Sequence, residues 1–243
     1  MQQQRRSKKQ RPAKTEQAPW GEPKEPVKKL GPTRLATVAF SPRNAYQAHA
    51  KAMLSCHPVV FLVGPAGTAK TTLAAAQAVD DLLEGRARSL MLTRANVEAG
   101  EPIGALPGTQ REKMEIWCRA MLDALALFLG KGQVKWMLDQ GLIELMPSGL
   151  LRGQSLNDIT VIVDEYQNLT PKQGKLVLTR IGENARFIMT CDPEQCDLPE
   201  NKPSACEDME RFEGEPGIAF VDFDEEDVTR SEACRTIIRC YGK

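Results

Sequence analysis

Eight consecutive residues form the segment of this sequence best suited to chemistry. They are Gly64-Pro65-Ala66-Gly67-Thr68-Ala69-Lys70-Thr71, and Thr72 follows them. Glycines let a loop turn its backbone N–H groups around a phosphate, and a helix that begins there adds unpaired N–H groups and its positive dipole end. Lys70 can reach the β- and γ-phosphates of a nucleotide, and the Thr71 hydroxyl is a hard oxygen ligand for Mg²⁺. The segment therefore predicts a site for ATP and magnesium.

Two adjacent carboxylates, Asp164 and Glu165, follow the apolar run 160–163. Open α/β sheets bind ligands at the carboxyl ends of their strands, so these side chains are expected at the same site. Asp164 is predicted to hold Mg²⁺, directly or through water. Glu165 is predicted to accept a proton from an attacking water or to orient that water. The glutamate favours hydrolysis over transfer of the phosphoryl group to a metabolite.

A third apolar run, 187–190, leads into the polar segment 191–195. We expect this strand beside the other two, with Gln195 close enough to the γ-phosphate to report its presence. The segment contains Asp192 and Pro193, and because Asp-Pro is common in turns this motif alone is weak.

The elements that must position these residues alternate between short apolar runs and helical patterns. Strands are expected at 59–63, 89–93, 142–146, 160–163, 187–190 and 218–221, and helices at 43–57, 71–83, 111–129, 131–139, 172–182 (after Pro171) and 229–241. Residues 96–110 are rich in Gly and Pro and are expected to form a loop. This alternation predicts an α/β fold, a mostly parallel sheet flanked by helices on both faces.

The first 40 residues have a different composition. Residues 1–34 carry ten basic and three acidic side chains, a net charge of +7 in a chain whose total is zero. Few of these residues are apolar, so residues 1–40 are expected to be a disordered basic tail and 41–243 to be the folded domain. Basic arms often bind nucleic acid, and a merely solubilising role is an equal alternative.

Composition argues against several other classes. Seven cysteines without CxxC spacing favour scattered reduced thiols in a cytoplasmic protein. The only histidines, His49 and His57, sit in no ligand-spaced cluster, which disfavours a zinc site and histidine-based catalysis. No stretch approaches the roughly 18 apolar residues that span a membrane, and the basic N-terminus lacks the apolar run of a secretory signal.

Several ordered sequence blocks carry a family resemblance. They are RNAYQ (43–47), GPAGTAKT (64–71), TRANVEAGEPIGALPG (93–108) with EKM (112–114), LLRGQSLND (150–158), IVDEYQNLTPKQ (162–173), LTRIG (178–182), TCDPEQCDLP (190–199) and DVTR (227–230). Together they resemble the PhoH-like proteins, an ATPase family related to superfamily-one helicases, over residues 41–242. The resemblance implies a single RecA-like P-loop NTPase domain.

The resemblance also implies roles for residues outside the three motifs. Gln47 is expected to contact the adenine, and Gln195 again to sense the γ-phosphate. Arg230 and Arg180 are candidates for a cation beside the developing phosphoryl charge, where an arginine can raise the rate by roughly 10³–10⁵. A surface salt bridge is an open alternative for each of them. Arg94 lies where related motors touch single-stranded nucleic acid.

Three positions depart from the family pattern. Ala69 stands where glycine usually precedes the lysine, Tyr166 where alanine usually follows the Asp-Glu pair, and Cys191 where glycine usually precedes the aspartate. We interpret Ala69 as tolerated, since alanine can adopt the dihedral angles at a helix entry. The departures put the rate of turnover in doubt more than nucleotide binding.

A helicase-like ATPase acting on nucleic acid, RNA more than DNA, is the function that the resemblance favours. Related translocating helicases use two such domains, so a single domain predicts a homo-oligomeric ring, such as a hexamer, in which Arg180 or Arg230 completes a neighbour's site. A slowly hydrolysing switch or adaptor that acts through partners is the alternative that Ala69 favours. A small-molecule kinase is a third interpretation, which Glu165 weakens.

Overall fold

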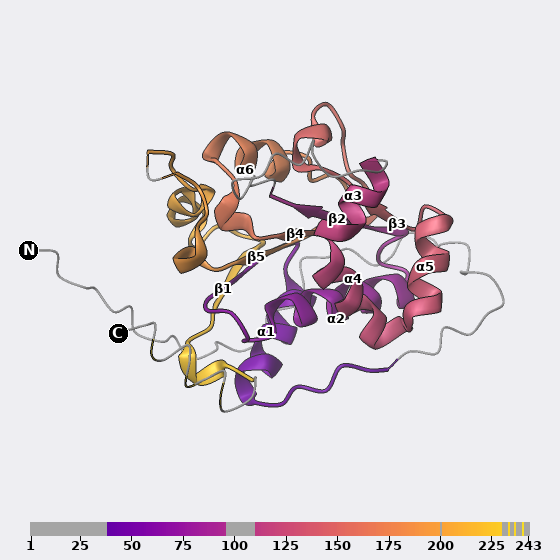
Figure 1. Ribbon diagram of the computed structural model, residues 1–243, viewed down its shortest axis with the longest axis horizontal. Coiled ribbons are helices and arrows are strands. Elements are labelled where there is room, and N and C mark those ends of the chain that lie inside the picture. The colour runs from indigo at the N-terminus through magenta and orange to yellow at the C-terminus, as the bar shows by residue number, and fades with distance from the viewer. Residues whose placement is uncertain are drawn as a thin grey trace, which may run out of the picture.

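A six-stranded parallel sheet forms the centre of the molecule (Figure 1). The computed structural model describes residues 38–95, 110–199 and 201–229 and three single positions after them, Ala233, Thr236 and Cys240. Within them, the strands are β1 (Val59–Val63), β2 (Ser89–Arg94), β3 (Ile143–Leu145), β4 (Ile159–Asp164), β5 (Arg186–Cys191) and β6 (Ile218–Asp222). The α-helices are α1 (Ala45–Cys56), α2 (Lys70–Leu83), α3 (Gln110–Trp117), α4 (Arg119–Leu129), α5 (Lys131–Asp139) and α6 (Pro171–Leu178).

The central strands are continuous apolar runs because helices cover both of their faces. Every residue of β4 and β5 is buried. Alternate residues point to opposite sides: Leu62 and Ile188 pack with α1, α2, α4 and α5, whereas Phe61 and Phe187 pack with α6 and the short 3-10 helices. Figure 1 shows α1, α2 and α4 on one side of the sheet and α6 on the other. The predicted α/β fold is confirmed.

The strand order β3-β2-β4-β5-β1-β6 places β5 between β1 and β4. Val63 pairs with Cys191 across β1 and β5, and Val163 pairs with Met189 across β4 and β5. All three strands are parallel, so their carboxyl ends meet at one edge of the sheet. The segments that follow them, which carry the three sequence motifs, are thereby brought together, as predicted.

Two helix predictions were wrong in extent. The helix expected at 111–129 is two helices, α3 and α4, which meet at Cys118. Arg94 donates a hydrogen bond to the carbonyl of Trp117, the last residue of α3, at 3.1 Å, and a side chain inserted at a helix ladder is a common cause of such a break. The helix expected at 172–182 ends at Leu178, because the following residues pair with Leu156 instead.

Other predictions fall on residues that the structure does not describe. They are the loop at 96–110 except Gln110, the tail up to residue 37, and most of the helix at 229–241. The boundary expected at residue 41 moves slightly, because Val38 donates a backbone hydrogen bond to Phe128 of α4 at 3.1 Å and the ring of Phe40 packs on the ring of Phe128. Packing of the chain against the domain therefore begins by residue 38.

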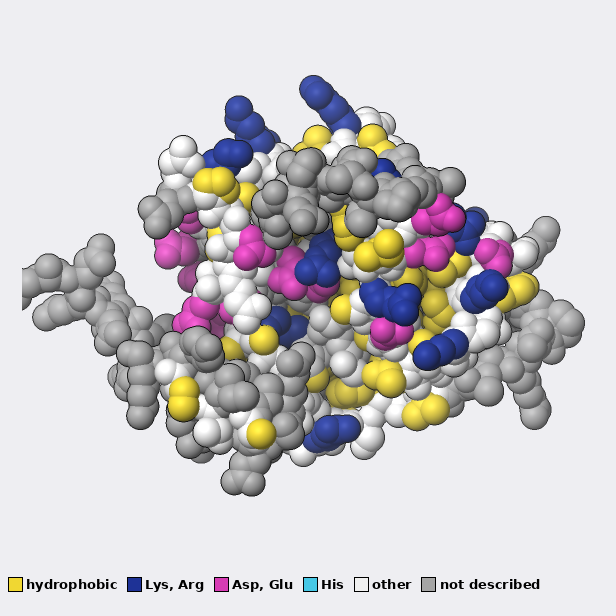
Figure 2. Space-filling view, in the orientation of Figure 1, with side chains coloured by type: hydrophobic (Ala, Val, Ile, Leu, Met, Phe, Trp, Pro, Cys, Tyr) yellow, Lys and Arg dark blue, Asp and Glu magenta, His cyan; other side chains and the backbone are white. Residues whose placement is uncertain are grey.

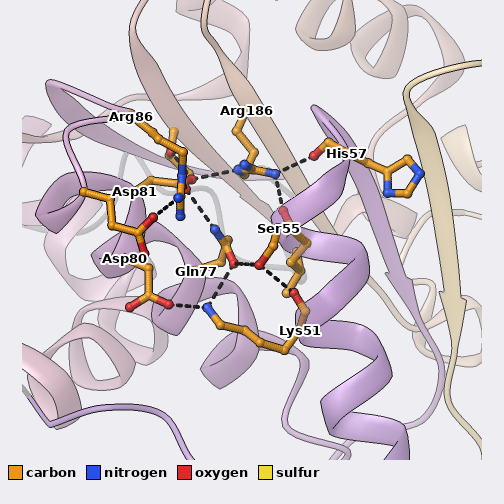
Figure 3. A network of polar contacts seen from close by, with 11 residues as sticks. Lys51, Ser55, His57, Gln77, Asp80, Asp81, Arg86 and Arg186 are labelled. Carbon is orange, nitrogen blue, oxygen red and sulfur yellow. Dashed lines mark hydrogen bonds and ion pairs between the residues drawn. The ribbon is translucent and has the colours of Figure 1, made fainter. Parts of the chain in front are cut away.

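A buried network of polar contacts ties α2 to the sheet at the end away from the three motifs (Figure 3). The Asp81 carboxylate, on α2, accepts hydrogen bonds from Arg186 at 2.7 Å, Arg86 at 2.8 Å, Thr160 at 2.8 Å and Gln77 at 2.8 Å. Arg186 begins β5 and Thr160 lies in β4, so one carboxylate fixes the helix against both central strands. Burial lowers the pKa of Arg186, and the charge of Asp81 opposes that shift.

Candidate nucleotide-binding site

The loop between β1 and α2 is shaped by its glycines. Gly64 has a φ of +139°, and a Cβ there would lie 2.4 Å from the Phe223 carbonyl oxygen, so no other residue fits. Gly67 has a φ of +90° and its carbonyl accepts hydrogen bonds from the backbone N–H and the hydroxyl of Thr229 at 3.0 and 3.3 Å. The loop is thus held against both the β6 end and the segment that follows it.

Ala69 is the N-cap residue of α2 and adopts the left-handed conformation, with φ 71° and ψ 23°. Alanine does enter these dihedral angles, as expected, but the left-handed region costs a residue with a Cβ about 1–2 kcal/mol. Glycine avoids this cost, which accounts physically for the glycine usual in the family. The loop of this chain is therefore built with strain that a glycine at this position would avoid.

The Lys70 ammonium lies inside the loop. Its Nζ donates to the carbonyls of Gly64 and Pro65, the latter at 2.9 Å. Burial lowers the pKa of Lys70, while the nearby charges of Asp192 and Glu165 oppose the shift. A half-buried cation at the start of a helix, whose first backbone N–H groups have no partner within the helix, is suited to bind a phosphate.

Asp164, the last residue of β4, is buried. Its carboxylate accepts a hydrogen bond from the Thr190 hydroxyl at 2.5 Å, and Thr190 lies on the neighbouring strand β5. Burial raises the pKa of Asp164, and the Thr190 hydrogen bond opposes the shift. Thr190 was not identified from the sequence, although a threonine at the tip of an otherwise apolar strand was a usable signal.

Glu165 is fixed from two sides. Its Oε1 lies 3.4 Å from Arg94 Nη2, and its Oε2 accepts a hydrogen bond from Gln167 Nε2 at 2.6 Å. The backbone of Glu165 is in the left-handed region, with φ 55°, which for a non-glycine residue is typical of functional sites. Arg94, expected at a nucleic-acid surface, thus pairs with the carboxylate expected to act on water.

Gln167 links the Asp-Glu pair to the segment after β5. Besides contacting Glu165, its Nε2 donates to the Gln195 carbonyl at 3.2 Å, and its Oε1 accepts from the Asp192 backbone N–H at 3.0 Å. The side chain is fully buried. The sequence carried no signal for this role beyond the position two residues after Glu165.

These groups surround a cleft of about 620 Å³. The cleft is lined by most of the predicted site, namely Ala66, Gly67, Ala69, Lys70, Thr71, Thr72, Asp164, Glu165 and Gln195. Further lining comes from Arg43 and from an apolar wall on α4, Ala120, Ala124 and Leu127. Gln47 is buried behind this lining, where its Oε1 accepts from the Arg43 backbone N–H at 2.9 Å, and its contact with adenine stays a prediction.

Of the two candidate arginines, the structure describes Arg180 but not Arg230. Arg180 follows α6 and donates to the carbonyls of Leu176 and Gln154 at 3.2 and 3.1 Å, so it closes the end of that helix. It lines no part of this chain's own cleft. Arg230 lies outside the described residues, one position after Thr229, which does line the cleft.

The other two departures from the family pattern, Tyr166 and Cys191, are both buried. Tyr166 is 1% exposed and its ring packs edge-on against Phe61 with ring centroids 5.4 Å apart, in the core beneath α6. A Cβ on Gly174 of α6 would lie 2.7 Å from the Tyr166 hydroxyl, so the tyrosine depends on that glycine. Cys191 is buried at the end of β5, with its sulfur 2.7 Å from that of Cys206.

The face of the molecule in Figure 2 carries side chains of both charges and hydrophobic side chains. On the face in Figure 2, Lys and Arg side chains are scattered among Asp and Glu side chains, and hydrophobic side chains appear among them over the α3–α5 region. Exposed large apolar residues of these helices are Ile116, Leu127 and Trp136. In the described ranges, no helix combines the length and hydropathy required to cross a bilayer.

The fold and the cleft define the class: this is a RecA-like P-loop protein, with the phosphate loop after β1 and the Asp-Glu pair after β4. A sequence model of the family described as "PhoH-like protein" matches residues 39–242, and the chain belongs to that family. The expected membership is confirmed.

Relatives support the assignment over most of the chain. A PhoH-like protein of Bacillus subtilis (strain 168) is 40% identical over 193 residues, covering 79% of this chain and 60% of that protein. Protein PhoH of Escherichia coli (strain K12) is 35% identical over 203 residues, covering 82% and 57%. This chain thus spans less than two thirds of the length of these relatives.

Among solved structures, the large terminase from a thermophilic bacteriophage (crystal form 2) has a similar fold. The TM-score is 0.51 at 10% sequence identity, over 82% of this chain and 50% of that chain. At this identity the likeness supports the fold and carries no statement about activity.

Proposed function

We propose that this chain is a magnesium-dependent ATPase whose hydrolysis is coupled to nucleic acid, RNA more than DNA. The observation that carries the proposal is the convergence of three strand ends on one cleft. Lys70 follows β1 through the loop, Asp164 ends β4, and the segment with Gln195 follows β5. Phosphoryl transfer to water requires a cation, a carboxylate that holds the metal ion and a second carboxylate that acts on the water. Here these groups surround a space of about 620 Å³.

The donor set suits magnesium. The Thr71 hydroxyl and the Asp164 carboxylate both line the cleft, and Mg²⁺ prefers such hard oxygen ligands. Bound there with the nucleotide, the ion would neutralise charge on the triphosphate. Lys70 and the loop N–H groups bind the phosphates, Glu165 orients the attacking water or accepts its proton, and Gln167 and Arg94 hold Glu165 in place.

Several further features belong to the same proposal. We propose a cytoplasmic homo-oligomer, to be tested as a hexameric ring, formed by the folded domain with the basic residues before it as a tail. In it, Arg180 or Arg230 of one copy faces the cleft of the next. The tail carries a charge of +7 over residues 1–34 and is suited to contact phosphates of a nucleic acid.

Phosphate release measured with and without single-stranded RNA, and with single-stranded DNA as comparison, tests the function. Glu165→Gln should keep ATP binding and lose turnover by roughly 10²-fold or more. Lys70→Ala should weaken ATP binding itself. Unchanged ATP affinity in Lys70→Ala, or full turnover in Glu165→Gln, contradicts these assignments.

A nucleotide-dependent switch that hydrolyses slowly is the second candidate. The left-handed conformation of Ala69 favours it, because a strained loop residue beside the phosphates can slow turnover without abolishing binding. Tight ATP binding with negligible phosphate release, unaffected by RNA, would favour the switch. RNA-stimulated release would favour the ATPase.

A further inference from the structure

Two thiols meet at the base of the nucleotide cleft. The sulfur of Cys191, the last residue of β5, lies 2.7 Å from the sulfur of Cys206, in the 3-10 helix η5 (Ala205–Phe212). Both backbones are anchored. Cys191 pairs in register with Val63 of β1, and the start of η5 is bound by the Ala205 N–H to the Leu169 carbonyl at 2.7 Å. The sulfur–sulfur contact is therefore fixed by two well-packed segments.

The two thiols open onto different cavities. Cys191 lines the nucleotide cleft, whereas Cys206 lines a second cavity of about 500 Å³. Cys206 is half-buried, so small solutes can reach its sulfur from the second cavity, while Cys191 is 1% exposed. A third thiol, the exposed Cys196, lines the same second cavity and serves as an internal comparison.

The surroundings shift the pKa values of the two thiols in opposite directions. Hydrogen bonding from Cys191 and from Ser204 lowers the pKa of Cys206. The same contact and burial raise the pKa of Cys191. The thiolate is the nucleophilic form, so Cys206, which is also the more exposed of the two, is the thiol better suited to attack first. An accessible thiolate beside a resolving cysteine is the arrangement found in redox-sensing sites.

We propose that Cys191 and Cys206 are a redox-active dithiol that reacts with hydroperoxides, and that its disulfide form slows ATP hydrolysis in the adjoining cleft. The Cys206 thiolate attacks the terminal peroxide oxygen. The O–O bond breaks, the leaving oxygen departs as water or alcohol after taking up a proton, and Cys206 becomes a sulfenic acid. The Cys191 sulfur then attacks the Cys206 sulfur, and the S–O bond breaks. The hydroxyl leaves as water with the proton of the Cys191 thiol, so both sulfurs are oxidised and the peroxide is reduced.

Little movement is needed for the bond. A disulfide has a sulfur–sulfur length of about 2.05 Å, and the two atoms already lie 2.7 Å apart. The new ring would enclose residues 192–205, which include Asp192 and Gln195, both in the nucleotide cleft. The bond would fix this segment to β5, and any movement of Gln195 with the phosphate would then be restricted. This last consequence rests on the proposed function, whereas disulfide formation does not.

Peroxide treatment of the whole chain, followed by peptide mapping under non-reducing conditions, tests the dithiol directly. The expected main product is a cross-link between the peptides that carry Cys191 and Cys206, reversed by dithiothreitol. Before oxidation, iodoacetamide should label Cys206 faster than the more exposed Cys196. Sulfinic acid at Cys206 without a cross-link, or a cross-link that mainly involves Cys196, would overturn the assignment.

Turnover measured before and after oxidation tests the coupling. Wild type and Cys196→Ser should lose ATP turnover severalfold with peroxide and regain it with dithiothreitol, and Cys206→Ser should be insensitive. Equal loss in Cys206→Ser would overturn the link to the cleft. If no form of the protein hydrolyses ATP, the proposed function fails, while the mapped cross-link still decides whether the dithiol exists.

Discussion

The Arg94 guanidinium bridges the carboxylate of Glu165, 3.4 Å away, and the carbonyl of Trp117, 3.1 Å away. Arg94 ends β2, Glu165 follows β4, and the two strands are paired in register. The arginine therefore links the junction of α3 and α4 to the residue expected to act on water. A change at that junction can reach Glu165 through a single side chain.

Arg94→Gln should lower kcat and leave the affinity for ATP nearly unchanged. The hydrogen bonds of the arginine go to the carboxylate that positions water and to the end of α3, away from the backbone of the phosphate loop. Because general-base catalysis contributes roughly 10²–10⁴-fold, loss of one orienting contact should cost a severalfold part of it. Steady-state kinetics together with nucleotide titration separate kcat from binding.

Arg88→Gln is the matched control for this substitution. Arg88 lies just before β2 and its Nε is 3.6 Å from the Asp158 carboxylate in a solvent-exposed ion pair, a kind that contributes about 0–1 kcal/mol. The Arg88→Gln substitution should leave both kcat and the affinity for ATP unchanged. Equal kinetics for the two variants would show that the Arg94–Glu165 contact has no part in turnover.

Asp164→Asn should stabilise the protein at neutral pH when nucleotide and metal are absent. The folded-state pKa of Asp164 is raised by burial, so the folded chain binds this proton more tightly than the unfolded chain does. Tighter binding of this proton stabilises the folded chain in full below the unfolded pKa of about 3.9. The stabilisation is lost as pH rises through the raised folded pKa. Asparagine does not ionise and escapes that loss.

Urea unfolding in a chelator, at neutral pH and again at about pH 4, measures this effect. The gain of Asp164→Asn over wild type should be larger at neutral pH and shrink in acid. Asp123→Asn, whose side chain is 61% exposed, should change stability by less than about 0.5 kcal/mol at either pH. A gain that is the same at both pH values would show that Asp164 does not ionise with a raised pKa.

Asp81→Asn should destabilise the domain strongly. The substitution removes the carboxylate charge that faces the buried Arg186 guanidinium at 2.7 Å. Breaking one member of a buried ion pair costs about 3–5 kcal/mol, because the remaining charge stays desolvated. The free energy of unfolding from urea titration gives the cost.

A substitution at the neighbouring residue, Asp80→Asn, is the control for the measurement on Asp81→Asn. Asp80 lies on the same turn of α2, but its side chain is 36% exposed and pairs with Lys51, whose side chain is 21% exposed (Figure 3). Asp80→Asn should therefore cost only about 0–1 kcal/mol. Similar losses for the two variants would mean that the Asp81–Arg186 contact is no stronger than a surface pair.

The sequence predicted secondary structure best for the strands that helices cover on both faces of the sheet. The strands expected at 160–163 and 187–190 are present in the structure, each one residue longer at both ends. They were identifiable because a strand covered on both faces is a mostly apolar run. The phosphate loop and the Asp-Glu pair were identifiable because their chemistry lies in contiguous residues.

Contacts that depend on strand register were not accessible from the sequence. Thr190 meets Asp164, and Gln167 joins Glu165 to Gln195, only because β5 lies between β1 and β4. The end of α3 also depends on a contact between distant residues, because Arg94 of β2 donates a hydrogen bond to the carbonyl of Trp117, the last residue of that helix. The position of Tyr166 in the core was not accessible from the sequence either, because it depends on the space left by Gly174 of α6.

Ala69→Gly should raise the free energy of unfolding by up to about 1.6 kcal/mol. The left-handed conformation of Ala69 costs about 1–2 kcal/mol, from which the greater freedom of glycine in the unfolded chain, about 0.4–1 kcal/mol, must be subtracted. Ala66→Gly is the control in the same loop, because Ala66 does not have a positive φ. It should lose about 0.4–1 kcal/mol, so the two substitutions should differ in sign.

The same pair of variants bears on the choice between ATPase and switch. A rise in kcat for Ala69→Gly, absent in Ala66→Gly, would identify the strained Ala69 as the feature that slows hydrolysis and would favour the switch. An unchanged kcat together with the stability gain would show that the loop tolerates the alanine during turnover. If Ala69→Gly instead loses as much stability as Ala66→Gly, the left-handed conformation is not a source of strain in this loop.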